Sequence, residues 1–331
     1  MLKRSGKDIF IHHDGALGDT LLSLPCISLI RQSASYIHLA GRSDVAAFLK
    51  ETGMVDAVSS VDSAVYSSLY AESMDEKIGR LLSAYDELYL FTLHYDSQFA
   101  RNMRRISQNV TVIKTIPPEG CNEHVAEYRL RQYGYDREGG KGKTSLCVPE
   151  EAMNWAKGLL KGLCYADGRD VLIAVHPGSG GRKKCWPMEN YQALITMIAI
   201  DPRVICIVLS GPAEDGNTVQ ALSQLAQNNK RIMHLRHESL IRIAACMGLS
   251  DFYIGNDSGI SHLAGVLQCR GIVLFGPTDP RLWRPFGDTL EVLRFETEGT
   301  VVLSAGQVYA RMKSALAPEK TKIDFRQHLL I

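Results

Sequence analysis

The first absence in this 331-residue chain is a long hydrophobic run. No run approaches the roughly 18 apolar residues that a membrane-spanning helix needs, so the sequence predicts no such helix. The basic start, MLKR, is followed only by the short apolar run from Ile9 to Ile11. That run fits a strand better than the core of a signal peptide.

The chain also lacks a strong net charge and paired cysteines. Its 37 Lys and Arg balance 36 Asp and Glu, so a net charge of +1 creates no global field for nucleic acid. Its eight cysteines form no CxxC pair, and we expect reduced core residues in a cytoplasmic protein. No carboxylate pair shows metal-ligand spacing, so we expect neither a metal nor a cofactor.

Two common nucleotide-binding signatures are missing as well. The glycine turn after the first strand lacks the third glycine of GxGxxG, which argues against a nicotinamide-dependent oxidoreductase. The later glycine-rich loop does not follow the P-loop pattern G-x-x-x-x-G-K-[ST]. Any nucleotide site in this chain must therefore be built differently.

Short apolar runs alternate with helical patterns along the whole chain, which indicates an α/β protein. At this length two domains are expected. Tyr135 to Thr144 is the one stretch with linker composition, rich in glycine and charge. We place an N-terminal domain at residues 1–150 and a C-terminal domain at residues 151–331.

The most informative stretch runs from Phe252 to Pro285. A buried strand there feeds a polar turn and a short helix, so unpaired N–H groups and the helix dipole favour an anion. We interpret the turn as half of a phosphate or nucleotide site; the alternative is that Asp257 or Ser258 only caps the helix, which would need one polar residue. The stretch has five: Asn256, Asp257, Ser258, Ser261 and His262.

A second candidate anion site is HPGSGGRKKCWP, from His176 to Pro187. Its glycines, its serine and three consecutive cations after a buried strand suit a diphosphate, although a solvated loop with incidental lysines is the alternative. The loop from Ser210 to Asp215 follows the next strand. It places Glu214 where ribose hydroxyls could be met, or where the helix dipole simply favours acids.

The first strand ends in a turn of its own, DGALGD, from Asp14 to Asp19. Doubly wound folds bind ligands at such turns. Asp19, at the amino end of the following helix, has no Lys or Arg close to it in the sequence. It is either the helix N-cap or a general base.

Two basic clusters have two interpretations each. Arg101, Arg104 and Arg105 form one, and Arg129 and Arg131 lie on a second predicted helix, from Glu123 to Tyr133. They either contact an anionic acceptor or lie on solvated helix faces.

Taken together, these motifs resemble the heptosyltransferases of lipopolysaccharide core synthesis, glycosyltransferase family 9. The resemblance rests on GALGD before LLSLP, HPGSGGRKKCWP, SGPAED and GNDSGISHLAGVLQCRGIVLFGPTDPRLWRP, in that order, and extends from about Ile9 to Leu316. It implies a GT-B fold, with two Rossmann-like β/α/β domains facing each other across a cleft. It also implies an acceptor-binding N-terminal domain and a donor-binding C-terminal domain, with the last helix packing back on the former.

The family's activity is the inverting, metal-independent transfer of a sugar, typically from ADP-heptose, to a lipopolysaccharide core or related glycan. The implied partners are the nucleotide sugar and a glycan or lipid-linked acceptor, which leaves room for peripheral association with the inner membrane face. Three alternatives stay open: another nucleotide-sugar donor, an acceptor other than lipopolysaccharide, and a non-catalytic nucleotide-sugar binding protein.

The resemblance also assigns roles to residues of this chain. Asp19 matches the catalytic base, and Gly15 and Gly18 let the donor diphosphate approach. Ser179 and Lys184 match phosphate contacts, and Glu214 matches the acid that meets the ribose. The second phosphate and sugar loop comprises Asp257, Ser258, Gly259 and His262.

Overall fold

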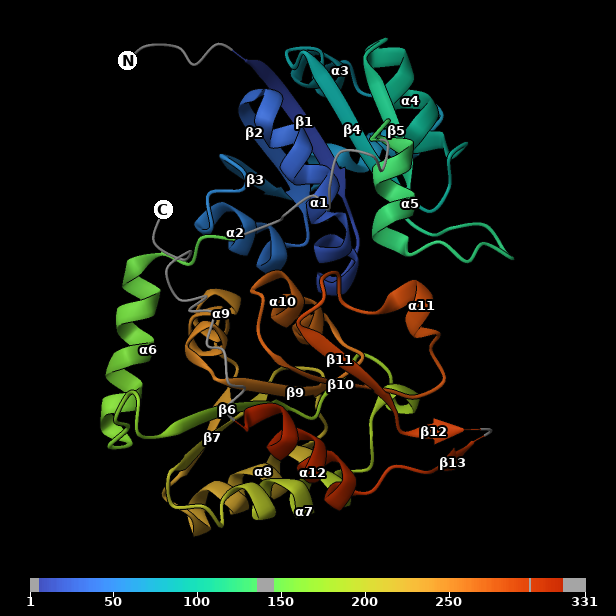
Figure 1. Ribbon diagram of the computed structural model, residues 1–331. Coiled ribbons are helices and arrows are strands. Elements are labelled where there is room, and N and C mark those ends of the chain that lie inside the picture. The colour runs from blue at the N-terminus through green and yellow to red at the C-terminus, as the bar shows by residue number, and fades with distance from the viewer. Residues whose placement is uncertain (1–5, 136–145, 298, 318–331) are drawn as a thin grey trace. The chain divides into compact units, whose positions relative to one another are not determined.

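The computed structural model describes residues 6–135, 146–297 and 299–317 (Figure 1). The chain divides into two compact units, and the expected linker lies, except for Tyr135, outside the described residues. The first unit comprises Met1–Leu146 with Arg281–Phe286, and the second comprises Cys147–Pro280 with Gly287–Ile331.

The first unit is built on a five-stranded parallel sheet of order β3-β2-β1-β4-β5. The strand order reverses beside β1, and ligands bind at the carboxyl ends of strands at such a switch point. The strands are β1 (Lys7–His13), β2 (Ala34–Gly41), β3 (Ala57–Ser60), β4 (Glu87–Thr92) and β5 (Val110–Lys114). The helices are α1 (Leu17–Ser33), α2 (Ser43–Glu51), η1 (Ala64–Tyr70), α3 (Glu76–Leu82), α4 (Gln98–Ile106) and α5 (Val125–Gln132).

The second unit holds a six-stranded parallel sheet of order β11-β10-β9-β6-β7-β8. Its strands are β6 (Val171–His176), β7 (Val204–Ser210), β8 (Ile232–Arg236), β9 (Phe252–Asn256), β10 (Gly271–Phe275) and β11 (Leu290–Arg294), and β12 (Glu296–Thr297) and β13 (Thr300–Val301) form a separate antiparallel pair. Its helices are α6 (Glu150–Gly162), η3 (Arg182–Lys184), α7 (Met188–Ile198), α8 (Gly216–Asn228), α9 (Leu240–Leu249), α10 (Gly259–Val266) and α12 (Ala305–Leu316), and α11 (Pro280–Trp283) spans the division between the units.

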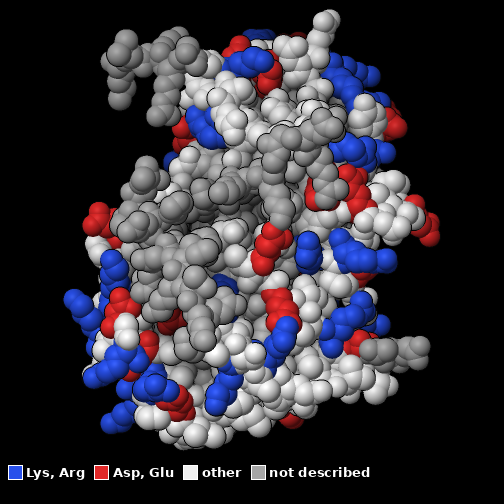
Figure 2. Space-filling view, in the orientation of Figure 1, with Lys and Arg blue, Asp and Glu red and all other residues white. Residues whose placement is uncertain are grey.

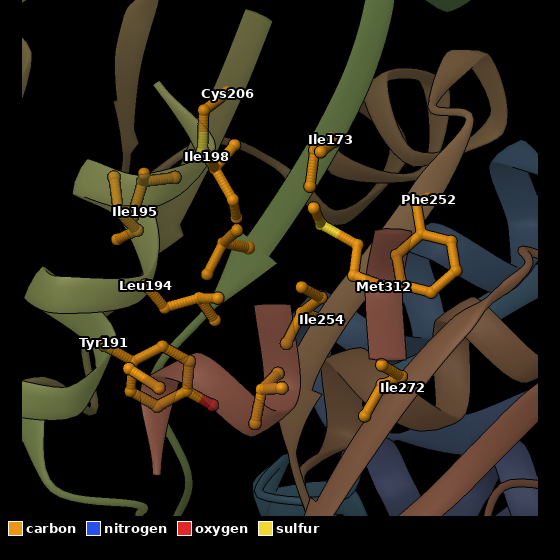
Figure 3. Close-up of a cluster of buried hydrophobic side chains, with 14 of the residues drawn as sticks. Ile173, Tyr191, Leu194, Ile195, Ile198, Cys206, Phe252, Ile254, Ile272 and Met312 are labelled. Atoms are coloured by element: carbon orange, nitrogen blue, oxygen red, sulfur yellow. The ribbon is translucent and has the colours of Figure 1, made fainter. Parts of the chain in front are cut away.

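Every residue of β7, β9 and β10 is buried, which explains why these strands read as continuous apolar runs. Side chains from their two faces pack against the flanking helices. Figure 3 shows one such cluster, which contains Ile254 of β9 together with Leu194 and Ile195 of α7.

Helix α12 belongs to this second core. Its residues Val308 and Met312 are buried in the same cluster as Leu194 (Figure 3 labels Met312). Burying two such side chains contributes about 3–6 kcal/mol, which is ample to fix the helix there. Helix α12 therefore packs in the core of the second unit, and its expected packing on the N-terminal domain stays a prediction.

The cysteines only partly match their expected core positions. All eight are free thiols, and Cys26, Cys206, Cys246 and Cys269 are buried. Cys147 and Cys164 are exposed, so the expectation of core positions was wrong for them. Within the described ranges, no helix is long and apolar enough to cross a membrane, and no group of three or more His, Cys, Asp or Glu could hold a metal ion.

Candidate functional site

The turn after β1 is shorter than the sequence suggests. Helix α1 begins at Leu17 with Ala16 as its N-cap, so Gly18 and Asp19 lie inside its first turn. Gly18 is therefore a helix residue rather than a turn residue, and Asp19 is not the N-cap. Gly15 does need to be glycine, because a Cβ there would lie 2.6 Å from His13 Cε1 and 2.8 Å from Asp19 Cβ.

Asp19 has a partner that is distant in the sequence, Arg129 of α5. Its Oδ1 lies 3.5 Å from Arg129 Nη2, and the arginine side chain is fully buried whereas that of Asp19 is 40% exposed. Arg129 also donates to the Asp19 carbonyl, to Ser23 Oγ at 2.7 Å and, through Nε and Nη2, to Thr115 O at 3.1 and 2.7 Å. The prediction that Arg129 lies on a helix surface is therefore wrong. Its buried side chain holds the first turns of α1 in place through Asp19 and Ser23.

Burial lowers the pKa of Arg129 to about 10, with Asp19 opposing that effect. The guanidinium therefore stays protonated at neutral pH. The nearby His13 is neutral, since burial, reinforced by Arg129, holds its pKa well below the usual range. Its Nδ1 accepts from Gly15 N at 3.1 Å, so its protonated Nε2 donates to Ser23 Oγ at 2.9 Å.

A cavity of about 520 Å³ lies at the carboxyl edge of the same sheet. Arg42 Nε donates to the Asp14 carbonyl at its rim. Burial raises the pKa of the Asp14 carboxyl, with Arg42 opposing. The lining residues are Asp14, Arg42, Ser43, Asp44, Val61, Asp62 and Tyr70.

In the second unit, the loops after β6 and β9 are joined by two polar contacts. Lys184 Nζ lies 2.9 Å from Asp257 Oδ2, and Ser179 Oγ donates to the Asp257 carbonyl at 2.7 Å. The lysine side chain is 42% exposed while that of Asp257 is 4% exposed. Because β6 and β9 are adjacent strands, this places an accessible ammonium group beside the amino end of α10.

His176 links Glu214, the candidate ribose-binding residue, to the turn before α10. Its Nε2 lies 3.4 Å from Glu214 Oε1, and its Nδ1 lies 3.3 Å from Ser258 Oγ. Gly211 N donates to Glu214 Oε2 at 2.6 Å. Burial alone would raise the pKa of Glu214, but the hydrogen bonds from His176 and Gly211 together lower it. The carboxylate is thus ionised and preorganised. A Cβ at position 178 would lie 1.4 Å from Oε1, so any residue other than glycine there would displace the Glu214 side chain.

The structure separates the two acids that start α8. Asp215 is the N-cap, accepting from Thr218 N at 2.8 Å, so the helix-dipole interpretation applies to it. Glu214 lies outside the helix with its side chain only 3% exposed. Glu214 therefore does not cap the helix.

The polar turn before α10 is partly structural. Ser258 caps the helix, accepting from Ser261 N, and Asn256 binds Pro177 O, Trp186 N and the Tyr191 hydroxyl. Ser261 donates to the Asn256 carbonyl. Asn256 and Ser261 are therefore engaged in holding the turn, so the turn itself uses more than the one polar residue that helix capping was expected to need. Asp257 and Ser258 stay beside Lys184 and His176, while Gly259 begins α10 and His262 is buried in its first turn.

The predicted site residues thus fall into two groups. The first unit holds Gly15, Gly18 and Asp19, and the second holds Ser179, Lys184, Glu214, Asp257, Ser258, Gly259 and His262. Sequence reasoning missed His13 and Ser23, placed His176 in a candidate loop without giving it a role of its own, and misplaced Arg129. The helical spacing offered one signal for the last of these: Arg129 follows the buried Val125 by four residues, so it falls on the core-facing side of α5.

The chain resembles proteins of known family. A family model described as Glycosyltransferase family 9 (heptosyltransferase) matches residues 122–310. Lipopolysaccharide heptosyltransferase 1 of Escherichia coli is 28% identical over 131 residues, which span 40% of each chain. Lipooligosaccharide heptosyltransferase 2 of Campylobacter jejuni is 23% identical over 82% of this chain and 81% of its own.

A solved structure shows the same fold. The E. coli heptosyltransferase WaaC with ADP has a TM-score of 0.67 at 18% identity, covering 93% of this chain and 99% of its own. The two Rossmann-like α/β units expected of the GT-B class are confirmed.

Proposed function

The chain belongs to glycosyltransferase family 9, and from that premise we propose that it transfers a sugar from ADP-heptose to a lipopolysaccharide core or related glycan. The observation that carries the proposal is the set of loops around His176. An accessible Lys184 beside a helix amino end suits a diphosphate, and the buried Glu214 carboxylate suits the hydroxyls of a ribose. The ADP bound by the E. coli structure supports the nucleotide.

In the proposed mechanism, Asp19 takes the proton of an acceptor hydroxyl, whose oxygen attacks the anomeric carbon from the face opposite the leaving ADP. The bond to the diphosphate breaks, and the configuration inverts. Lys184 and the N–H groups at the start of α10 stabilise the charge that builds on the leaving group. These groups would do the work that a divalent metal does in other transferases.

The acceptor and donor sugar have rivals within the family, namely another nucleotide sugar or a glycan other than lipopolysaccharide. A non-catalytic nucleotide-sugar binding protein is the third alternative. The presence of Asp19 on an accessible helix start, ion-paired yet 40% exposed, favours an enzyme over that alternative.

The test is a calorimetric titration of the full chain with ADP, UDP, GDP and NAD, with no divalent metal added. We expect selective ADP binding. A preference for UDP or GDP would leave the family assignment intact but would reject ADP-heptose as the donor. Binding of NAD alone would contradict the proposal, as would the absence of any nucleotide binding.

We expect Lys184→Ala to weaken ADP binding about 10- to 100-fold, the loss typical of one charge-assisted contact. The control is Lys183→Ala, because its exposed side chain neighbours Lys184 in sequence. Lys184→Arg keeps the charge and should retain much of the affinity. If titration showed equal affinity for Lys184→Ala and wild type, Lys184 would have no place in the diphosphate site.

Turnover of ADP-heptose is expected to survive excess EDTA, since Lys184 and helix N–H groups supply the positive potential. ADP release is the readout, with and without added Mg²⁺. A strict requirement for a divalent cation would refute the metal-free mechanism while leaving the family assignment intact.

A further inference from the structure

The first unit includes one short stretch from late in the chain, Arg281–Phe286. The chain leaves the second unit after Pro280 and returns to it at Gly287, and we call the stretch between them the strap. Helix α11, which begins at Pro280, has four residues, and none of them is buried. Because so short a helix does not hold its own position, the strap depends on its contacts with the first unit.

The strap packs on the two helices that carry and hold Asp19. Its residues Trp283 and Phe286 pack against a small buried cluster made of Leu22 of α1 and two residues of α5. Leu22 follows Asp19 by three residues, so the cluster lies one helical turn from the proposed base. Arg129, which binds Asp19, lies about one turn further along α5 than the cluster.

His124 fixes the strap to the amino end of α5. Burial lowers the pKa of His124, so its ring is neutral at neutral pH. Its Nδ1 accepts from Ala126 N at 3.2 Å as the N-cap of the helix, so the proton is on Nε2. Nε2 donates that proton to Arg284 O at 2.8 Å. The centre of the His124 ring also lies 5.8 Å from that of Phe286.

The strap starts shortly after a loop of the proposed donor site. Gly276 follows β10, and a Cβ there would lie 3.0 Å from the carbonyl oxygen of Lys183, the neighbour of Lys184. At the other end of the strap, Gly287 has a φ of 120°, a conformation that suits glycine. One continuous segment therefore runs from the loop beside Lys184 to the helices that hold Asp19.

The strap has a polar outer side and an apolar inner side. Arg281 and Arg284 are exposed, and Figure 2 shows Lys and Arg at the surface in the region where Figure 1 draws α11. Trp283 and Phe286 face the small cluster, which is separate from the larger core cluster around Phe10. The strap therefore adds little to the main core of the first unit, and what distinguishes it is the pair of helices that it contacts.

We propose that the strap is a positioning element for Asp19, with His124 as the residue that fixes it in place. The proposal rests on the proposed role of Asp19 as the general base. Proton transfer needs the carboxylate within hydrogen-bond reach of the acceptor hydroxyl, and a displacement of about 1 Å can cost about 10²-fold in rate. The strap acts on Asp19 through Leu22 and Arg129, and it is not a catalytic group itself.

The first test is His124→Asn. Asparagine is a favoured N-cap and can still accept from Ala126 N, but its shorter side chain does not reach Arg284 O. We expect kcat for ADP release from ADP-heptose to fall about 5- to 20-fold, while the KM for the donor and the affinity for ADP stay within about twofold. The urea midpoint should stay close to that of wild type, because the helix cap is kept.

The second test removes the apolar contact. Trp283→Ala with Phe286→Ala should lower kcat about 10- to 100-fold, again with little change in ADP affinity. The matched control is Trp155→Ala, because Trp155 is also half-buried but lies on α6 of the second unit. Hydrogen exchange gives a readout that does not need turnover. Amides in the first half of α1 should exchange at least about fivefold faster in the strap variants than in wild type or the control.

The inference is overturned if His124→Asn and the double variant turn over the donor as fast as Trp155→Ala. It is also overturned if their ADP affinity and urea midpoint fall in step with kcat, because the strap would then be an ordinary structural contact. If wild type released no ADP from ADP-heptose, the proposed function would fail instead. Exchange at α1 would then decide the inference alone, and unchanged exchange in the strap variants would overturn it.

Discussion

Replacing Asp19 with asparagine is expected to lower turnover of ADP-heptose about 10²- to 10⁴-fold, the range that a general base contributes. The amide cannot take a proton from an acceptor hydroxyl, yet its oxygen can still accept from Arg129. The variant therefore removes the base while keeping the contact that holds the first turn of α1. The measurement is ADP release with a lipopolysaccharide truncated before the heptose region as acceptor.

Donor affinity should stay within a few-fold of wild type in this variant, because the proposed phosphate and ribose contacts, Lys184 and Glu214, belong to the second unit. Calorimetric titration with ADP separates that outcome from a general loss of structure. Asp14→Asn tests the rival carboxylate, which lines the adjacent cavity and whose pKa is raised by burial. If Asp14→Asn abolished turnover and Asp19→Asn did not, the base would be Asp14.

The sequence predicted most of the fold because the central strands carry their own signal. Strands β9 and β10 are buried throughout and read as short apolar runs, and a glycine or a polar turn ends each of them. The start of α1 was harder to predict. Its N-cap is Ala16, which makes no side-chain capping bond, so nothing local marks Gly18 and Asp19 as helical.

The site residues were predictable where a loop has an unusual composition. They were not predictable where contacts between distant parts of the chain determine what a side chain binds. Lys184 and Asp257 stood out as a cation and an acid in polar loops, but their pairing joins residues far apart in the chain. Asp215 caps α8, whereas its neighbour Glu214 binds His176, which lies nearly forty positions earlier in the sequence. The catalytic and binding roles of these residues remain predictions, for which the variants above are the tests.

Arg129→Met is expected to destabilise the protein by about 3 kcal/mol or more. Removing one partner of a buried charged network leaves Thr115 O without its two hydrogen bonds from Arg129, at a cost of about 1–3 kcal/mol, and takes one of two donors from Ser23 Oγ. Methionine fills similar space, so the loss reports the polar contacts rather than a cavity. The measurement is urea unfolding of the full chain, followed by circular dichroism.

The same helix supplies a matched control. Arg131, two residues further along α5, is 62% exposed and forms an ion pair with Glu123, and such surface pairs contribute only about 0–1 kcal/mol. Arg131→Met should therefore leave the unfolding midpoint nearly unchanged. Equal midpoints for the two variants would mean that the hydrogen bonds of Arg129 add nothing to the stability of the fold beyond what hydrogen bonds to water provide. A lowered midpoint for Arg129→Met alone would show that one buried guanidinium holds α5 and the start of α1 together, and with them the carboxylate of Asp19.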